Sequence, residues 1–571
     1  MYIFCKPQSA SPVWNLTKRT LLPTVLGAIA SVLLATPLHA AERLFFFLGP
    51  LQLSVYMDSL EQFAEDGTIE KDLALYLNRV DEDTREEFRK ALLQPVEVNA
   101  LQLSRVLNTP IGEMVLEQLG NVVTLPSGGN GQYALRAAIT EASFDDEGLT
   151  VLNLLQAFPT DIRINPSWIF SIAKSLERVV DDTTKMIEEV EQLSLASLDT
   201  ENAVEFSQQP DIRQLGPFSV TQQTWMLTDQ SRQFPAGSER DRQFRVLIYQ
   251  PDGPPTAWRE GKTPVVVMSH GLASNPEDRG NLAAHLASYG FVVALPQHPG
   301  SDTQHVTDLL AGYTREVFSV NEFIDRPLDI SYVIDELEYR NRSEFGDRLD
   351  LNNVGLLGHS FGGYTVLALA GATIDPVHLR ADCERQGYLN VSLLLQCRAL
   401  VLPSISAETF RDDRVTAVVA VNPVNNSIFG PEGLSQVEIP VALVAGSLDP
   451  AAPAIFEQLL SFPWITSSDK YLMLSEGQAH VDFSQLDAGI SQTLNSLSDL
   501  TLPSPDLLHG YGNALSLAFF ETFVAQQTDY EMYLDSSYTR YISQDPFGIY
   551  LLQANQEDAL VESLEDVGLI D

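Results

Sequence analysis

A chain of 571 residues is too long for one ordinary domain and indicates two or three. Hydrophobic residues make up 44% and charged residues 19%, which is typical of a globular protein with a sizeable core. The net charge of −41 excludes nucleic-acid binding, because phosphate recognition requires clustered Lys and Arg, and it disfavours lasting adhesion to anionic membranes.

The N-terminus has the pattern of a secretory signal peptide. Lys6, Lys18 and Arg19 precede an uncharged apolar run over 20–35, and small residues follow up to Ala41. We therefore predict a signal peptide over 1–41 and export to a periplasm, lumen or extracellular space. The alternative is an uncleaved signal that anchors the protein in a membrane, because the apolar run is close to the lower limit for a span.

Residues 42–192 are predicted to form a mainly helical domain. Its first segment, 42–55, has the alternation of one or two strands, and helical periodicity begins at Met57. Thr109-Pro110 and Asn165-Pro166 are helix-start signals, because proline fits the first helical turn. No catalytic or metal-binding pattern is present here. The polar segment 193–216 lacks periodicity and is interpreted as a linker.

From 217 to 530 short apolar runs alternate with helical stretches. This pattern predicts a mostly parallel, doubly wound α/β sheet with ligands at the carboxyl ends of its strands. A helix is expected to begin at Pro327, and another to cover 511–527. Residues 531–571 are a C-terminal extension, loosely ordered from Gln556. The predicted strands cover 218–228, 242–250, 265–268, 291–295, 354–357, 415–421, 441–445 and 471–474.

A G-x-S-x-G pattern follows one of these strands. Gly358-His359-Ser360-Phe361-Gly362 leads from the apolar run 354–357 into helix-forming residues. At a sharp strand-to-helix turn, glycines two residues to either side of the serine remove steric collisions. Ser360 is therefore the predicted nucleophile, with Gly358 and Gly362 as the glycines of the turn.

A serine needs a general base, and the base needs an acid that orients it. Asp449 stands on a loop after the buried run 441–445, and His480 follows the run 471–474 on a loop that contains Gly477. The order serine, acid, histidine is that of α/β-hydrolases. The remaining histidines fit less well; His298, for example, precedes the serine.

Stabilisation of an oxyanion requires two preorganised backbone N–H groups. The N–H of Phe361, directly after the nucleophile, supplies one. The turn Ser269-His270-Gly271-Leu272 follows another buried run, and we assign the N–H of Leu272 as the second donor.

Two of the three cysteines, Cys383 and Cys397, remain after signal cleavage. In an oxidising compartment such a pair is interpreted as a disulfide, and the alternative is two buried free thiols. The segment 374–410 that contains them is long for a helix-to-strand connection, so we expect a lid or pocket wall there. No metal or organic cofactor is implied.

Three stretches together carry a family resemblance. Residues 268–272, 286–294 and 358–363 resemble secreted platelet-activating-factor acetylhydrolases, which are lipase-like α/β-hydrolases. The front half resembles a helical domain of unknown function that precedes such hydrolases in bacterial exported proteins. The resemblance implies a serine esterase that cleaves short or oxidised acyl groups from phospholipids.

The expected function is therefore an exported hydrolase of carboxylic esters, with a small ester or lipid as substrate. The N-terminal domain could shield the site, dock a partner or assist export, and the sequence identifies no protein partner for it. A peptidase or thioesterase on the same three residues is one alternative. A non-catalytic binding protein that uses the hydrolase pocket is another.

Overall fold

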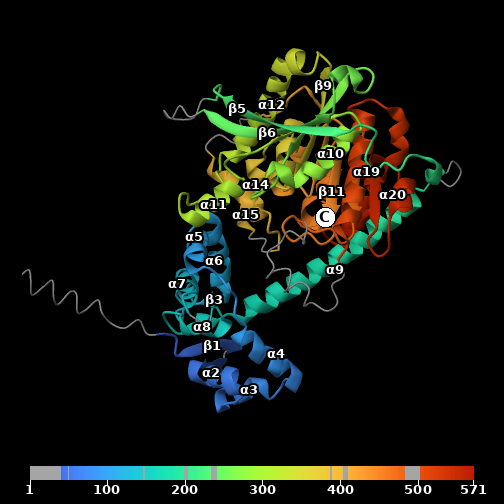
Figure 1. Ribbon diagram of the computed structural model, residues 1–571. Coiled ribbons are helices and arrows are strands. Elements are labelled where there is room, and N and C mark those ends of the chain that lie inside the picture. The colour runs from blue at the N-terminus through green and yellow to red at the C-terminus, as the bar shows by residue number, and fades with distance from the viewer. Residues whose placement is uncertain are drawn as a thin grey trace, which may run out of the picture. The chain divides into compact units, whose positions relative to one another are not determined.

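The structure is a computed structural model that describes residues 40–48, 51–145, 148–198, 204–232, 241–385, 389–402, 409–481 and 502–570 (Figure 1). The predicted signal peptide thus lies almost entirely outside the described residues. The described chain forms two compact units. The smaller contains the residues up to Ala100 together with Leu119–Pro166, and the larger contains Leu101–Gln118 and the residues from Ser167 onward.

The smaller unit combines short helices with a four-stranded sheet of order β2-β1-β4-β3. Leu60, Phe63, Ala138 and Ile162 are almost inaccessible to solvent and form its core. Strands β3 and β4 were not predicted, because two or three residues are too short to show alternation. The elements are β1 (Arg43–Leu48), β2 (Leu51–Tyr56), α2 (Met57–Asp66), α3 (Lys71–Leu77), α4 (Glu82–Leu93), β3 (Val123–Thr124), α7 (Gln132–Ala142), α8 (Val151–Gln156) and β4 (Ile162–Ile164).

Helix α9 (Pro166–Ala196) begins at the predicted proline, but it belongs to the larger unit. Met186 and Val190 are completely buried in the same apolar cluster as the large sheet. The predicted boundary at residue 192 therefore lies inside a helix. The predicted linker also differs from the structure, because Phe206 and Ile212 are buried in a second apolar cluster.

The segment Leu101–Gln118 also packs with the larger unit. It contains most of α5 (Ala100–Leu107) and the first part of α6 (Pro110–Val122). Ile111 packs against the apolar cluster of the sheet, and the Arg105 guanidinium donates a hydrogen bond to the carbonyl of Leu310. The chain therefore passes into the larger unit, returns to the smaller one, and leaves it again at Pro166.

The larger unit is built on a nine-stranded sheet of order β13-β12-β11-β10-β9-β7-β8-β6-β5. Six neighbouring strands, β12 to β8, are parallel, and β5, β6 and β13 run antiparallel to their neighbours. The strands are β5 (Val220–Asp229), β6 (Arg242–Pro251), β7 (Thr263–Ser269), β8 (Val292–Pro296), β9 (Leu349–His359), β10 (Val415–Val421), β11 (Val441–Gly446), β12 (Lys470–Ser475) and β13 (Ile549–Gln553). The predicted α/β sheet is confirmed.

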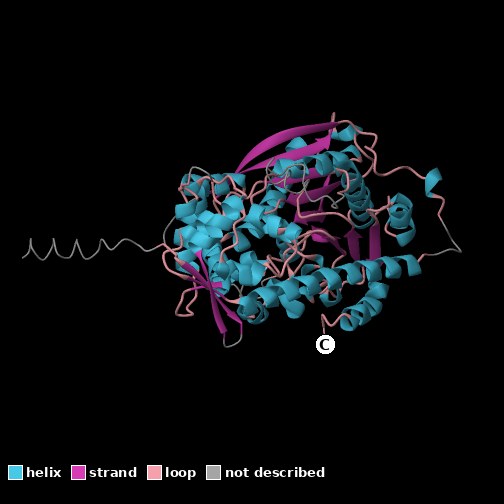
Figure 2. Ribbon diagram, turned by 90° about the horizontal axis from the view of Figure 1, so that it is seen from below, coloured by secondary structure: helices cyan, strands magenta, loops and turns pink. Residues whose placement is uncertain are grey.

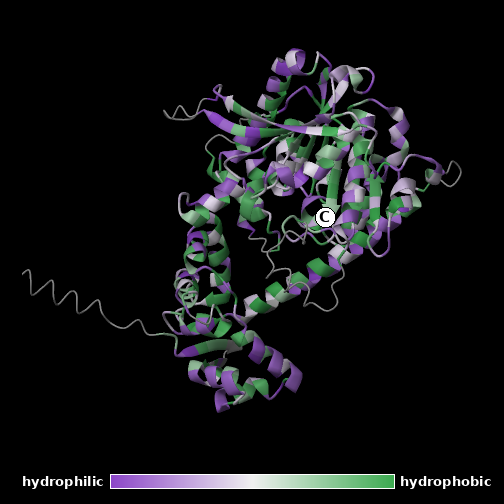
Figure 3. Cartoon of the chain, in the orientation of Figure 1, coloured by the Kyte–Doolittle hydropathy of each residue, from purple (hydrophilic) through white to green (hydrophobic). Residues whose placement is uncertain are grey.

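Helices cover both faces of this sheet (Figure 2). Alternate residues of β7 show why: Val265 and Val267 belong to one apolar cluster and Val266 and Met268 to the other, as expected for a strand buried on both sides. Figure 3 shows the hydrophobic residues gathered along these strands. Helices α12 (Glu322–Glu344) and α13 (Phe361–Leu369) pack on the first cluster, and α10 (Gly280–Ser288) and α19 (Pro505–Phe523) on the second.

The prediction that a helix begins at Pro327 was wrong, because α12 begins at Glu322 and the proline lies inside it. A proline has no N–H to donate to the carbonyl four residues earlier, here that of Phe323. The buried Tyr364 hydroxyl donates to this carbonyl oxygen at 2.8 Å, so the helix continues without an unsatisfied acceptor.

The prediction of a loosely ordered tail was also wrong. Helix α21 (Glu557–Asp566) forms where the loose tail was expected. Ahead of Gln556, strand β13 pairs antiparallel with β12, and α20 (Ser536–Ile542) contacts β13. Leu560 and Leu564 of α21 are completely buried in the apolar cluster of the sheet. Their i, i+4 spacing gives the acidic helix one apolar face, and that face stabilises it.

A disulfide joins Cys383, in α14 (Pro376–Glu384), to Cys397. No helix within the described residues is long and apolar enough to cross a membrane. The remaining helices of the larger unit are α11 (Thr303–Ala311), α15 (Leu393–Gln396), α16 (Asn426–Leu434) and α17 (Ala454–Glu457).

Candidate active site

Ser360 stands on a sharp turn between β9 and α13, with φ 57° and ψ −116°. This backbone conformation is rare for a residue with a side chain and marks a strained position. A Cβ atom at position 358 would lie 2.0 Å from the carbonyl oxygen of Gly362, and one at position 362 would lie 2.1 Å from that of Ser269. Both positions therefore require glycine, for the steric reason that the G-x-S-x-G pattern indicates.

The structure brings Ser360, His480 and Asp449 into one chain of hydrogen bonds. His480 Nδ1 lies 2.7 Å from Asp449 Oδ2, and His480 Nε2 lies 2.8 Å from Ser360 Oγ. A carboxylate only accepts, so Nδ1 carries the proton and Nε2 of the neutral ring accepts from the serine hydroxyl. The arrangement has the geometry of a nucleophile, a general base and an orienting acid.

All positions around the Asp449 carboxylate are occupied. Oδ1 accepts from the backbone N–H groups of Ala451 and Ala452, both at 2.8 Å. Oδ2 accepts from Asn422 Nδ2 at 2.7 Å in addition to His480. Asn422 directly follows β10, and the sequence analysis assigns it no role. Its position after a neighbouring parallel strand was the available signal that it would lie beside Asp449.

His359 supports the general base from the other side. Its Nε2–H donates to the carbonyl of His480 at 2.8 Å, and the two rings lie 4.8 Å apart between centroids. Burial, the charge of Arg279 and the neighbouring His480 hold the pKa of His359 well below its usual range. His359 therefore stays neutral and adds no positive charge beside His480.

The turn predicted to supply an oxyanion donor is held by Arg326, a completely buried residue of α12. Its guanidinium donates to the carbonyls of His270, at 2.6 Å, and Gly271, at 3.2 Å. In a trans peptide the N–H points opposite to the carbonyl, so the Leu272 N–H is directed away from Arg326. Neither this N–H nor that of Phe361 donates to any described residue, and both remain available to a ligand.

Arg326 also contacts the second predicted donor residue. Its guanidinium carbon lies 4.4 Å from the centroid of the Phe361 ring. Its Nε donates to Ser301 Oγ at 2.9 Å, and Glu322 lies 3.6 Å away. One buried cation thus positions both sides of the predicted oxyanion site, a role that no local motif indicates.

A second Ser–His–Asp arrangement lies beneath this turn. Ser269 Oγ is 3.0 Å from His298 Nε2, and His298 Nδ1 is 2.8 Å from Asp329 Oδ2. All three residues are buried. Asp329 also pairs with Arg232 at 2.6 Å and with Arg242 at 2.8 Å, so its carboxylate belongs to a buried network of ion pairs.

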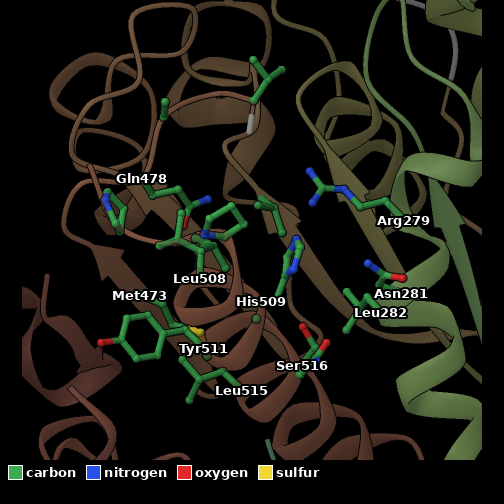
Figure 4. Close-up of a pocket in the computed structure, with 18 of the residues that line it drawn as sticks. Arg279, Asn281, Leu282, Met473, Gln478, Leu508, His509, Tyr511, Leu515 and Ser516 are labelled. Atoms are coloured by element: carbon green, nitrogen blue, oxygen red, sulfur yellow. The ribbon is translucent and has the colours of Figure 1, made fainter. Parts of the chain in front are cut away.

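A cavity of about 670 Å³ opens beside His480, which forms part of its wall. Figure 4 shows other residues of this wall, among them Gln478 and His509. Apolar residues from β9 to β12 and from α19 line most of it, among them Met473, Leu508 and Leu515. Arg279 and Asn281, at the start of α10, lie on the opposite wall. Among the described residues no three His, Cys, Asp or Glu side chains are grouped to hold a metal ion.

A largely parallel sheet in this strand order, with a serine on the turn after a central strand and an acid and a histidine after two later strands, is the α/β-hydrolase fold. By fold the chain is an α/β-hydrolase. Its residues 40–165 match the model of a family described as "Alpha/beta hydrolase of unknown function (DUF1400)". This match lies ahead of Ser360, Asp449 and His480. A search of curated proteins finds no match to the chain.

Proposed function

We propose that the protein is an exported serine hydrolase that cleaves carboxylic esters, with lipid or phospholipid acyl esters as the substrate class. The observation that carries the proposal is the hydrogen-bonded sequence Ser360–His480–Asp449 beside an apolar cavity. The resemblance of residues 268–272 and 358–363 to platelet-activating-factor acetylhydrolases supports short or oxidised acyl groups as the finer assignment.

In the proposed mechanism, His480 Nε2 takes the proton of the Ser360 hydroxyl while Oγ attacks the ester carbonyl carbon. The N–H groups of Leu272 and Phe361 donate to the resulting oxyanion. His480 then gives the proton to the departing alkoxide, and an acyl-enzyme remains. Water, deprotonated in turn by His480, attacks the acyl carbonyl carbon; the bond to Ser360 Oγ breaks, His480 returns the proton to Oγ, and the acid leaves. Asp449 keeps the proton on Nδ1 throughout and stabilises the imidazolium.

Export is part of the proposal. The N-terminal pattern of residues 1–41 supports it, and so does the Cys383–Cys397 disulfide, because disulfides persist mainly in oxidising compartments. The role of the segment 374–410 as a lid or pocket wall is likewise proposed. Equal rates of proteolysis in this segment with the disulfide oxidised and reduced would argue against that role.

The test uses the purified mature chain and aryl esters of increasing acyl length. Ser360→Ala is expected to lower kcat/KM roughly 10⁴-fold or more, because the nucleophile is lost. Ser269→Ala is the matched control, since it removes the same hydroxyl from the buried arrangement. A fluorophosphonate probe is expected to label wild type and Ser269→Ala but not Ser360→Ala. Equal ester hydrolysis by Ser360→Ala and wild type would refute the proposal.

A further inference from the structure

Arg279 lies in the wall of the cavity beside His480 and has no partner among the described residues. It donates no hydrogen bond and makes no ion pair to any described residue. Neighbouring arginines are paired: Arg245 with Glu277, and Arg259 with Glu521 at 3.0 Å. In Figure 4 the Arg279 side chain extends from the start of α10 toward the middle of the cavity.

The nearest acid does not neutralise Arg279. The Asp278 carboxylate accepts from the Ser274 hydroxyl and, at 2.9 Å, from the Asn275 N–H. Burial lowers the pKa of Arg279, and the charge of Asp278 only partly opposes this effect. A guanidinium nevertheless stays protonated in proteins, so a partly desolvated cation faces the cavity. Such a charge is costly unless an anion pairs with it.

The position of Arg279 connects it to the candidate catalytic residues. Its charge acts on His359, whose ring packs against His480. Arg279 and His480 both line the cavity, so one ligand can contact both.

The opposite wall of the cavity is largely apolar, although His509 and Ser516 also belong to it. Met473 and Leu515 lie there with Leu508 and the ring of Tyr511 (Figure 4). A ligand that fits both walls has an anionic group at one end and a hydrocarbon chain at the other. The net charge of −41 makes the protein as a whole repel anions. Any preference of the site for an anionic ligand therefore comes from Arg279 itself and not from the overall charge of the protein.

We infer that Arg279 binds a carboxylate or phosphate of the substrate while the apolar wall binds its chain, so that the preferred substrates are amphipathic, anionic esters. The planar guanidinium pairs with either oxyanion through two parallel hydrogen bonds. This inference rests on the proposed esterase function and specifies the substrate class of that same site.

The experiment compares two pairs of esters that differ in charge. The carboxylate pair is p-nitrophenyl hydrogen glutarate and p-nitrophenyl pentanoate, and the phosphate pair is hexanoyl-glycerophosphate and hexanoylglycerol. Wild type is expected to favour the anionic member of at least one pair. Arg279→Gln is expected to lower kcat/KM for that member about 10- to 100-fold, the worth of a hydrogen bond to a charged group, and to leave the neutral member nearly unchanged.

Two further variants make the result specific. Arg279→Lys keeps the cation and is expected to retain most of the preference, which also covers the case in which Arg279→Gln folds poorly. Arg342→Gln removes the same charge from an exposed position on α12 and is expected to change neither pair. Thermal unfolding of each variant checks that the fold is intact.

The outcomes separate the inference from the proposed function. If wild type hydrolyses both members of each pair equally, or if Arg279→Gln lowers both equally, the inference fails while the esterase assignment stands. If no ester is hydrolysed and a fluorophosphonate does not label Ser360, the esterase assignment fails and the inference with it.

Discussion

Two Ser–His–Asp arrangements lie in the larger unit, and their hydrogen-bond distances are nearly the same. In one, His480 is 2.8 Å from Ser360 and 2.7 Å from Asp449. In the other, His298 is 3.0 Å from Ser269 and 2.8 Å from Asp329. Residue type and distance alone therefore do not distinguish them, although only the first has the surroundings that acyl transfer needs.

The first difference is access. The His480 side chain is 16% exposed and lines the cavity, whereas that of His298 is 0% exposed. The second is the backbone: Ser360 occupies a strained turn next to two available N–H groups, while Ser269 ends strand β7. Only the first arrangement thus contains a residue that lines the cavity.

The third difference is electrostatic. Burial and the charge of Arg326 lower the pKa of His298 to about 4, which makes it a poor base near neutral pH. Burial raises the pKa of Asp329, but the charge of Arg242 and the hydrogen bond from His298 outweigh burial and hold this pKa below its usual range. We interpret the buried arrangement as a support for the turn above it. Two residues at this turn form hydrogen bonds with His298: Ser269 Oγ with Nε2 of the His298 ring, and His270 Nε2 with the His298 backbone N–H.

The largest predicted effect separates the two histidines. His480→Gln is expected to lower kcat/KM for aryl esters roughly 10⁴- to 10⁶-fold, because the general base is lost. His298→Gln is expected to act mainly on stability, at a cost of about 1–3 kcal/mol from unsatisfied buried partners. Ester hydrolysis and urea unfolding measure the two effects. Comparable losses of activity in both variants would contradict the distinction.

The two acids are expected to differ in the same way. Asp449→Asn keeps the shape but favours the wrong tautomer of His480, so kcat is expected to fall by about 10³- to 10⁴-fold. Asp329→Asn removes the anion between Arg232 and Arg242 and is expected to destabilise the fold by about 3–5 kcal/mol. Denaturation midpoints and steady-state rates check both. A stable Asp329→Asn variant would show that the ion network is dispensable.

The third prediction concerns pH. The pKa of His298 is about 4 in the folded state and 6.5 in an unperturbed one, so its stabilising contribution is complete above pH 6.5 and is lost as pH falls toward 4. Wild type is expected to lose about 3 kcal/mol more than His298→Gln over this interval. Burial raises the pKa of Asp325 to about 6, although the charge of Arg242 opposes this shift. Because its pKa is raised, Asp325 adds stability as pH falls, and it does so equally in wild type and in His298→Gln.

Unfolding in urea at pH 6.5 and pH 4 gives the difference directly. Because Asp325 is present in both proteins, its contribution cancels in the comparison. Equal losses of stability in wild type and His298→Gln would contradict the assignment of a neutral, buried His298.

The smallest predicted effect is that of Ser269→Ala. The change removes one donor to His298 and leaves its Nε2 unpaired, which is expected to cost about 1 kcal/mol of stability. Hydrolysis rates are expected to stay within about threefold of wild type, because Ser269 contacts no substrate. A loss as large as that of Ser360→Ala would assign the buried serine a direct catalytic role.

Much of the larger unit follows from local sequence. Runs such as 265–268 and 415–421 are continuous and apolar because their strands are buried on both faces, and their order placed Ser360, Asp449 and His480 at one edge of the sheet. The same reasoning could have placed Asn422 beside Asp449. Asn422 follows β10, Asp449 follows β11, and these two strands are parallel neighbours in the sheet.

Other features depend on contacts that no local pattern contains. Strand β13 forms by pairing with β12 across the edge of the sheet, and α21 is stabilised by burial of Leu560 and Leu564 despite its acidic composition. Arg279 and Arg326 belong to no motif, and their roles come from the cavity and from the carbonyls around them. His298 was set aside because it precedes Ser360, and its pairing with Ser269 and Asp329 is visible only in three dimensions.

The packing of Leu101–Gln118 with the larger unit has a consequence for folding during synthesis. Translation releases the chain from its N-terminus, and Arg105 must wait for its acceptor, Leu310, which lies 205 residues later. At ordinary rates of elongation the delay is roughly 10 to 40 seconds. All of the smaller unit has been synthesised long before then, so it can assemble around a segment that is still unpacked. The docking of α5 and the first part of α6 therefore cannot be completed before the chain has reached Leu310 of α11.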